Sequence, residues 1–457
     1  MKKKLYFIAM LLIGVMGVSN AQEENPECRQ NLSIYNEHVK VKNYDAAYAP
    51  WKMVYENCPS LSWANFLYGE RILKDKIKNS SGTEKDGFIQ DLIAVYEGGL
   101  KYFPKKTSIA EVACDIENLK YDNKMSTNQS TYDALHKAFT EDHENFSNPK
   151  SLYLYFRSLV NLHEKGSKEL QLVFDAYDDV TAKIEAENKK LTNVVTQLLP
   201  KEDDATITTK EKNQLRVASR NSETYGKIQG SIDAKLGQLA NCENLVPLYE
   251  KNFESKKGDL KWVKRAVSRM FNKECTDDPL FKKMFEVQMA MDPSANAYMF
   301  GGKLKMDAGD TKGAIADYNK AVELEEDKYR KSDILYKIAT TYRRGSKSTS
   351  RNYAQKAVNA NPANGKAYLL IASLYANSAN QCGTTTFEKR AIYWKAAEMA
   401  RKAGRVDPSL KSRSNRAAES YNAKAPTKTQ IFNNTMEGKT VSFSKCWVGG
   451  SVKVPKL

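Results

Sequence analysis

The sequence lacks the motifs of catalytic and metal sites, although carboxylates are abundant in its helical charge patterns. Its 457 residues include only four histidines, and His163-Glu164 lacks the second histidine that a zinc-binding helix motif needs. His136 and His143 are best explained as surface residues, because no cysteine or carboxylate completes a ligand set around them. The seven cysteines form no C-x-x-C pair, and the chain has no phosphate-binding glycine loop and no G-x-S-x-G elbow. We therefore expect no enzyme activity, no catalytic residues, no cofactor and no metal.

Long apolar runs are also scarce, and the clearest apolar run lies at the N-terminus. Three lysines at 2–4 precede an apolar run over 5–18, and Ser19 and Ala21 are small residues at the positions that a signal peptidase reads. The alternative is a membrane anchor, but that needs about 20 apolar residues. We predict a cleaved signal peptide at 1–21, no transmembrane segment after cleavage, and an exported protein that is periplasmic, associated with the outer membrane or secreted.

Acidic residues are fewer than basic ones, so the formal net charge is +16. A basic chain can bind nucleic acid, but export argues against that partner. An anionic glycan, a lipid surface or an acidic protein suits an exported protein better. The basic residues follow helical patterns along the chain, as solvated helix faces do, and an ordinary charged surface is the favoured interpretation.

Self-similarity at a fixed spacing is the strongest pattern that is present. Segments of the chain repeat large residues on a first helix and small residues on a second, which a proline then ends. The positions that fill this pattern are Ala314, Tyr318 and Ala321, then Ala339, Tyr342, Ala357 and Pro362, then Tyr368, Ala372, Tyr375, Ala396, Ala403 and Pro408, and more loosely Ala47, Trp51 and Pro59 near the N-terminus. Gly301 departs from the pattern, since leucine is usual there. We expect the polar stretch Lys74–Gly87 to be an enlarged turn.

These residues resemble the tetratricopeptide repeats of exported proteins from Gram-negative bacteria. The resemblance implies an all-α solenoid whose concave face binds peptides or folded proteins. It implies a non-enzymatic scaffold or adaptor for protein partners in the periplasm or outer envelope. The alternative is an envelope-associated binding protein for an anionic glycan or lipid. We expect N-terminal repeats over 22–104, further helices over 105–166, a disulfide-linked hairpin and connector over 242–294, and C-terminal repeats over 295–425.

The centre of the chain, 167–241, has a different pattern. Apolar residues there keep the 3-4 spacing of a coiled-coil seam, at Leu170, Val173, Tyr177, Val180, Ile184, Leu191, Val194 and Leu198. We predict an antiparallel coiled-coil hairpin whose first helix ends at Pro200. The narrow stripe favours an arm that projects from the solenoid, over two longer helices packed within it.

The last segment, 426–457, loses the helical pattern. Val441, Phe443, Lys445 and Trp447 alternate with mostly polar residues, and two glycines at 449–450 can turn the chain. We predict an extended tail with a small β-hairpin, which must dock on the helical body because such a hairpin is only marginally stable alone.

The cysteines of an exported protein are expected to form disulfides. Two pairs each bracket one helical hairpin, whose antiparallel helices bring the start of the first beside the end of the second. These pairs are Cys28 with Cys58 and Cys242 with Cys275; by elimination Cys382 joins Cys446 and staples the β-hairpin to the last repeat. This scheme leaves out Cys114, which lies on an apolar helical stripe and is expected to be buried.

Overall fold

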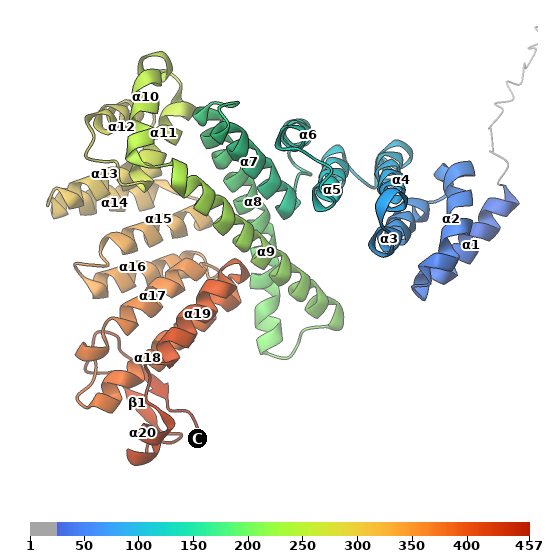
Figure 1. Cartoon of the computed structure of the whole chain (residues 1–457). Coiled ribbons are helices and arrows are strands. Elements are labelled where there is room, and N and C mark those ends of the chain that lie inside the picture. The colour runs from blue at the N-terminus through green and yellow to red at the C-terminus, as the bar shows by residue number, and fades with distance from the viewer. Residues whose placement is uncertain (1–24) are drawn as a thin grey trace, which may run out of the picture. The chain divides into compact units, whose positions relative to one another are not determined.

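The computed structural model describes residues 25–457, so the predicted signal peptide lies outside the described residues. The described chain is helical from α1 to α20 and adds only the short strands β1 and β2. It divides into two compact units (Figure 1): residues up to 126 together with 137–146, and residues 127–136 together with 147–457. Helix α6 (Asn128–Glu141) contributes to both. None of the helices over 25–457 is both long and apolar enough to cross a membrane.

The first unit contains stacked helical pairs. Its helices are α1 (Pro26–Lys40), α2 (Tyr44–Asn57), α3 (Ala64–Asn79), α4 (Gly82–Tyr102) and α5 (Ile109–Asp122). Trp51 is the centre of the packing: its indole N–H donates to the carbonyl of Asn65 over 2.7 Å. Its ring lies on Gly69, where a Cβ would be only 2.6 Å from Trp51 Cζ2. The Ala47 and Trp51 positions of the repeat pattern are therefore structural core positions.

The polar stretch Lys74–Gly87 is helical, and the prediction of an enlarged turn was wrong. Helix α3 continues to Asn79, and α4 begins at Gly82, whose φ of +58° makes the turn. The polar residues of this stretch lie on a solvated helix face, where Lys74 pairs with Glu70 over 2.6 Å. Polarity here indicated exposure and not the end of a helix.

The second unit holds an array of TPR-like helical pairs. After α7 (Pro149–Glu164) and a central hairpin come α10 (Cys242–Lys256), α11 (Leu260–Asn272) and α12 (Pro279–Met291). The pairs are α13 (Ala295–Asp307) with α14 (Thr311–Leu324), α15 (Lys328–Thr341) with α16 (Lys347–Ala360), and α17 (Gly365–Ala376) with α18 (Thr386–Val406), followed by α19 (Lys411–Asn422). The small residues of the repeat pattern, such as Ala314, Ala357 and Ala396, are fully buried where neighbouring helices meet.

Polar contacts tie successive pairs together. The hydroxyl of Ser332 on α15 donates to the carbonyl of Ala357 over 2.7 Å, and the Asn364 amide donates to the Ser332 oxygen over 2.8 Å. Gly302 lets the next helix approach, since a Cβ there would be 2.5 Å from the Tyr318 ring. The glycines at 301–302 thus allow close packing of α13 on α14, although they weaken α13 itself.

The central hairpin consists of α8 (Leu170–Asp203) and α9 (Thr209–Leu239). Pro200 does not end α8, which continues to Asp203; a proline in the last turn removes only one hydrogen bond near the helix end. The seam is also displaced near the tip, where Val195 is buried and Val194 only half-buried.

The hairpin does not project as an arm, and that prediction was wrong. Helix α9 lies between α7 and the 3-10 turn Pro408–Leu410 that follows α18 (Figure 1). The approach is so close that a Cβ at Gly226 would be 2.0 Å from the carbonyl oxygen of Ser409. The side of α9 that faces α7 and the Ser409 turn is therefore an internal contact of the second unit.

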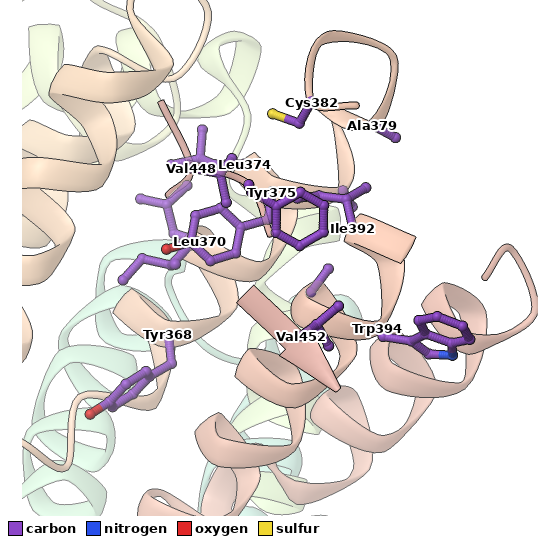
Figure 2. Close-up of a cluster of buried hydrophobic side chains, with 14 of the residues drawn as sticks. Tyr368, Leu370, Leu374, Tyr375, Ala379, Cys382, Ile392, Trp394, Val448 and Val452 are labelled. Carbon is purple, nitrogen blue, oxygen red and sulfur yellow. The ribbon is translucent and has the colours of Figure 1, made fainter. Parts of the chain in front are cut away.

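The C-terminal segment docks on the last repeat. Strands β1 (Thr440–Ser442) and β2 (Ser451–Lys453) are antiparallel, with Val441 opposite Val452, and both of these valines are buried. Figure 2 shows Val448 and Val452 beside Tyr375 and Ile392 of the last helical pair. The strands are shorter than the alternation suggested, because 443–450 forms a loop, and a short helix α20 (Lys428–Asn433) precedes them.

Three disulfides join Cys28 to Cys58, Cys242 to Cys275 and Cys382 to Cys446, with Cα–Cα distances of 6.4, 5.6 and 5.2 Å. The first two close helical hairpins. The third holds the loop between the strands against the turn that follows α17. Cys114 takes part in none of these bonds and is buried on α5.

Candidate functional site

The repeat-pattern residues do not form a binding site by themselves. Most are packing residues: Tyr318 and Ala339, for example, are almost entirely buried, and Tyr368 is 7 % exposed, whereas Pro362 is exposed. The histidines are held in local contacts. His136 stacks on the Tyr132 ring, with Nδ1 2.9 Å from the hydroxyl of Tyr155. His163 Nδ1 contacts the Lys168 carbonyl oxygen at 2.8 Å. In residues 25–457, no three histidine, cysteine or acidic side chains gather as a metal would require.

A cleft between the hairpin tip and the last repeat is the most suitable binding site. Its volume is about 740 Å³, within the range of ligand pockets. One wall is the C-terminal end of α8, and the other is formed by α17, α18 and the turn before α17. Apolar side chains form much of the lining: Val195, Leu199, Pro200, Pro362, Tyr368 and Val406. The site exists only because the hairpin folds back on the repeats.

Charged side chains of α18 line the same cleft. Arg401, Lys402 and Arg405 share it with Glu398. The Lys402 ammonium lies 5.0 Å from the centre of the Tyr368 ring, a cation–π distance. Arg405 reaches across the cleft mouth to Asp203 of α8. Burial raises the pKa of Glu398, while Arg401 opposes that change. The cleft thus combines an apolar lining with basic groups, as a site for an extended partner segment would.

The hairpin is anchored at its other end by a buried arginine. Arg269 of α11 is 6 % exposed, and one of its nitrogens donates to Asp178 of α8 over 2.6 Å. The same guanidinium contacts the Phe174 carbonyl at 3.0 Å and the Tyr249 hydroxyl. Burial raises the pKa of Asp178, although Arg269 and Arg265 lower it. This anchor is polar and internal, so it positions α8 and does not serve as an open site.

The charge of the chain is divided very unevenly. Residues 328–457, from α15 onward, contain 25 lysines and arginines but only 6 aspartates and glutamates, a formal charge of +19, whereas the whole chain has +16. The rest of the chain is therefore slightly acidic. The expectation that the positive charge is spread along the chain was wrong, because the balanced helix faces before α15 conceal the excess. Counting by segment would have found it.

Few of these cations are neutralised by carboxylates. Among the described residues, the ion pairs of 328–457 are those of Arg405 with Glu202 and Asp203 and of Lys411 with Glu223. Other cations of this segment donate to backbone carbonyls, as Lys395 does to Gly449 over 2.6 Å. The excess charge is therefore largely available to an external partner.

No family model matches the sequence, and no curated protein matches it either. Several solved structures share helical-repeat features with it. They include a tetratricopeptide repeat protein from Parabacteroides merdae, at 12% identity over 68% of this chain and 99% of that one, with a TM-score of 0.24. Yeast Tom70 has 13% identity over 88% and 97%, with a TM-score of 0.26, and an IFIT1 mutant with Gppp-AAAA has 14% over 79% and 80%, with 0.32. Similarities this distant carry no information about what this chain binds.

Proposed function

We propose that this chain is a non-enzymatic scaffold that holds partner proteins, and that the cleft between α8 and the last repeat receives a segment of such a partner. The observation that carries the proposal is the cleft itself, with an apolar lining from two separate elements and basic side chains on α18. An extended peptide would bury its apolar side chains there and place a carboxylate near Arg401 or Lys402. The TPR-like array supplies a rigid support for the α17–α18 wall.

We further propose that the protein works outside the cytoplasm, in the periplasm or outer envelope. Three disulfides support this location, because such bonds persist in oxidising compartments. The N-terminal segment 1–21 supports it independently by its order of lysines, apolar residues and small residues. Fractionation of cells that express the full chain, followed by N-terminal sequencing of the mature protein, tests both points.

Site-specific photocrosslinking tests the cleft. A photoreactive amino acid at Thr196, which lines the cleft, should crosslink to a defined partner protein in the native envelope. The matched control is the same amino acid at Gln197, which is exposed on α8 but is not part of the lining. Equal crosslinking at both positions, or none at either in native envelopes, would contradict the proposal. The partner identified by crosslinking at Thr196 should no longer co-purify with the Thr196→Trp variant, in which the larger side chain fills the cleft.

A further inference from the structure

The C-terminal subdomain, residues 424–457, is a compact and strongly basic surface. It contains six lysines, no arginine and a single acidic residue, Glu437. All six lysines, at 424, 428, 439, 445, 453 and 456, are exposed. Glu437 does not neutralise any of them, since its carboxylate accepts the backbone N–H of Leu457 over 3.0 Å. The subdomain therefore presents nearly its full positive charge to solvent.

An aromatic side chain stands out from the same subdomain. Phe432 of α20 is 71 % exposed, more than any other aromatic residue over 25–457, while its neighbour Ile431 is buried at 3 %. Helix α20 is thus anchored by one apolar residue and directs the next outward. Leu457, at 45 % exposed, adds a second apolar side chain to the subdomain. At 71 % exposure, the Phe432 ring contributes little to the packing of this chain.

The subdomain is held firmly, so this arrangement is a fixed surface. Cys446 is bonded to Cys382, and the buried valines of β1 and β2 pack on the last repeat. Lys395 and Arg351 of the repeats donate to the carbonyls of Gly449 and Val448 over 2.6 and 3.3 Å. A rigid surface loses little conformational freedom when it binds.

We propose that the subdomain 424–457 docks the protein on an anionic lipid bilayer, with Phe432 inserted at the headgroup level and the lysines over the lipid phosphates. The exposed Phe432 is the feature that fits this partner better than a soluble polyanion. Lysines attract a negative lipid surface without a fixed geometry, each contributing on the order of 1 kcal/mol. An exposed aromatic adds to binding only where an apolar phase is present. The basic repeats 328–423 extend the same positive field behind the subdomain.

Vesicle co-sedimentation of the full, oxidised chain tests the proposal. The chain should sediment with phosphatidylcholine vesicles that contain phosphatidylglycerol and stay in solution with phosphatidylcholine alone. The triple variant K428E/K439E/K453E should bind at least about a hundredfold more weakly. Phe432→Ser should weaken binding about tenfold, since it removes one apolar anchor. Raising the salt concentration should weaken the wild type steeply and the triple variant little.

Two matched controls separate this surface from charge in general. K78E/K105E/K106E makes the same charge change on exposed lysines of the first unit and should leave sedimentation within about twofold of the wild type, because those residues lie outside the basic segment. Val41→Ser removes a side chain that is 74 % exposed and should also have no effect. A thermal melt of each variant shows whether it is folded.

Three results would overturn the proposal. They are equal binding to neutral vesicles, an equal loss in both lysine triples, and retention on heparin without any binding to vesicles. The last would assign the charge to a soluble polyanion. Thr196→Trp should leave vesicle binding unchanged, so failure of the cleft proposal and failure of this one can be told apart.

Discussion

Gly226 of α9 lies directly against the backbone of Ser409, so close that a Cβ on residue 226 would be 2.0 Å from the Ser409 carbonyl oxygen. This contact joins the central hairpin to the turn after the last repeat. We expect Gly226→Ala to force the two segments apart and to lower the free energy of unfolding by about 1–3 kcal/mol, as overpacking does. Hydrogen exchange should rise at 408–411 and along α9. Thermal melting and hydrogen exchange measure both effects.

Gly230 supplies the control on the same helix. A Cβ there would meet nothing within 4 Å. Because alanine favours a helix over glycine, Gly230→Ala should raise the free energy of unfolding by up to about 1 kcal/mol. If Gly226→Ala were stabilising to the same extent, the close packing of α9 on the Ser409 turn would be disproved.

Arg269 should be one of the most sensitive positions in the second unit. Arg269→Met removes the closer of the two arginines that pair with the partly buried Asp178 and leaves the carboxylate with Arg265 alone, at 3.5 Å. Breaking a fully buried pair costs about 3–5 kcal/mol, and we expect about 2–3 kcal/mol here because Arg265 still faces the carboxylate. Chemical denaturation at neutral pH checks the value. Lys264→Met, which removes an exposed pair with Asp292, should cost less than about 1 kcal/mol.

The pH dependence of Arg269→Met gives a second readout. Burial already raises the pKa of Asp178, and Arg269 opposes that rise, so the variant should raise it further. A carboxyl group with a raised pKa binds its proton more tightly in the folded state. Stability then falls as pH increases from the unfolded-state pKa through the folded one. We expect the variant to lose least at acidic pH and most at neutral pH. A loss that is independent of pH would contradict the pairing.

The disulfide between Cys382 and Cys446 should hold the C-terminal subdomain in place. A loop of this length, with a sequence separation of 64, is stabilised by about 4 kcal/mol in the chain-entropy account. In C382S/C446S we expect proteolysis within 424–457 to increase while the helical content stays the same. Peptide mapping under non-reducing conditions should find three linked pairs in the wild type, none of which contains Cys114. A linked peptide with Cys114 would contradict the arrangement.

The repeats and the first two disulfides could be predicted from the sequence because each depends on spacing within one helical pair, and the third disulfide followed by elimination. Ala314 and Tyr318 are one helical turn apart, and Cys242 and Cys275 bracket one hairpin. The packing of the central hairpin could not be predicted in this way. Residues such as Asp178 and Gly226 make its contacts with the other helices. In a sequence, acidic residues and glycines on a helix face are ordinarily interpreted as exposed to solvent.

The cleft was missed for the same reason. Its walls come from α8 and α18, which are far apart in the sequence, and no local pattern links Leu199 to Val406. The basic segment is different, since a count of charges over 328–457 was available from the sequence alone. The excess positive charge of this segment was concealed by the balanced charge of the earlier helices, where ion pairs such as Lys74 with Glu70 are common.

Two deletions distinguish the part of the hairpin that supports the fold from the part that forms the cleft. Replacing 168–240 with a short linker should abolish cooperative unfolding, because Arg269 then loses Asp178 and the Ser409 turn loses α9. Trimming only 191–218 should leave these contacts intact. The tip has its own small core, with Val195 and Leu198 packed on Leu215 and Ala218, so its removal opens no cavity elsewhere.

Circular dichroism melts should show a cooperative transition for the trimmed chain and none for the full deletion. The trimmed chain lacks one wall of the cleft, including Thr196 itself, and should no longer co-purify with the partner identified by crosslinking, whereas binding to anionic vesicles should persist. If the chain with the full deletion melts like the wild type, the hairpin is an independent arm and does not support the fold.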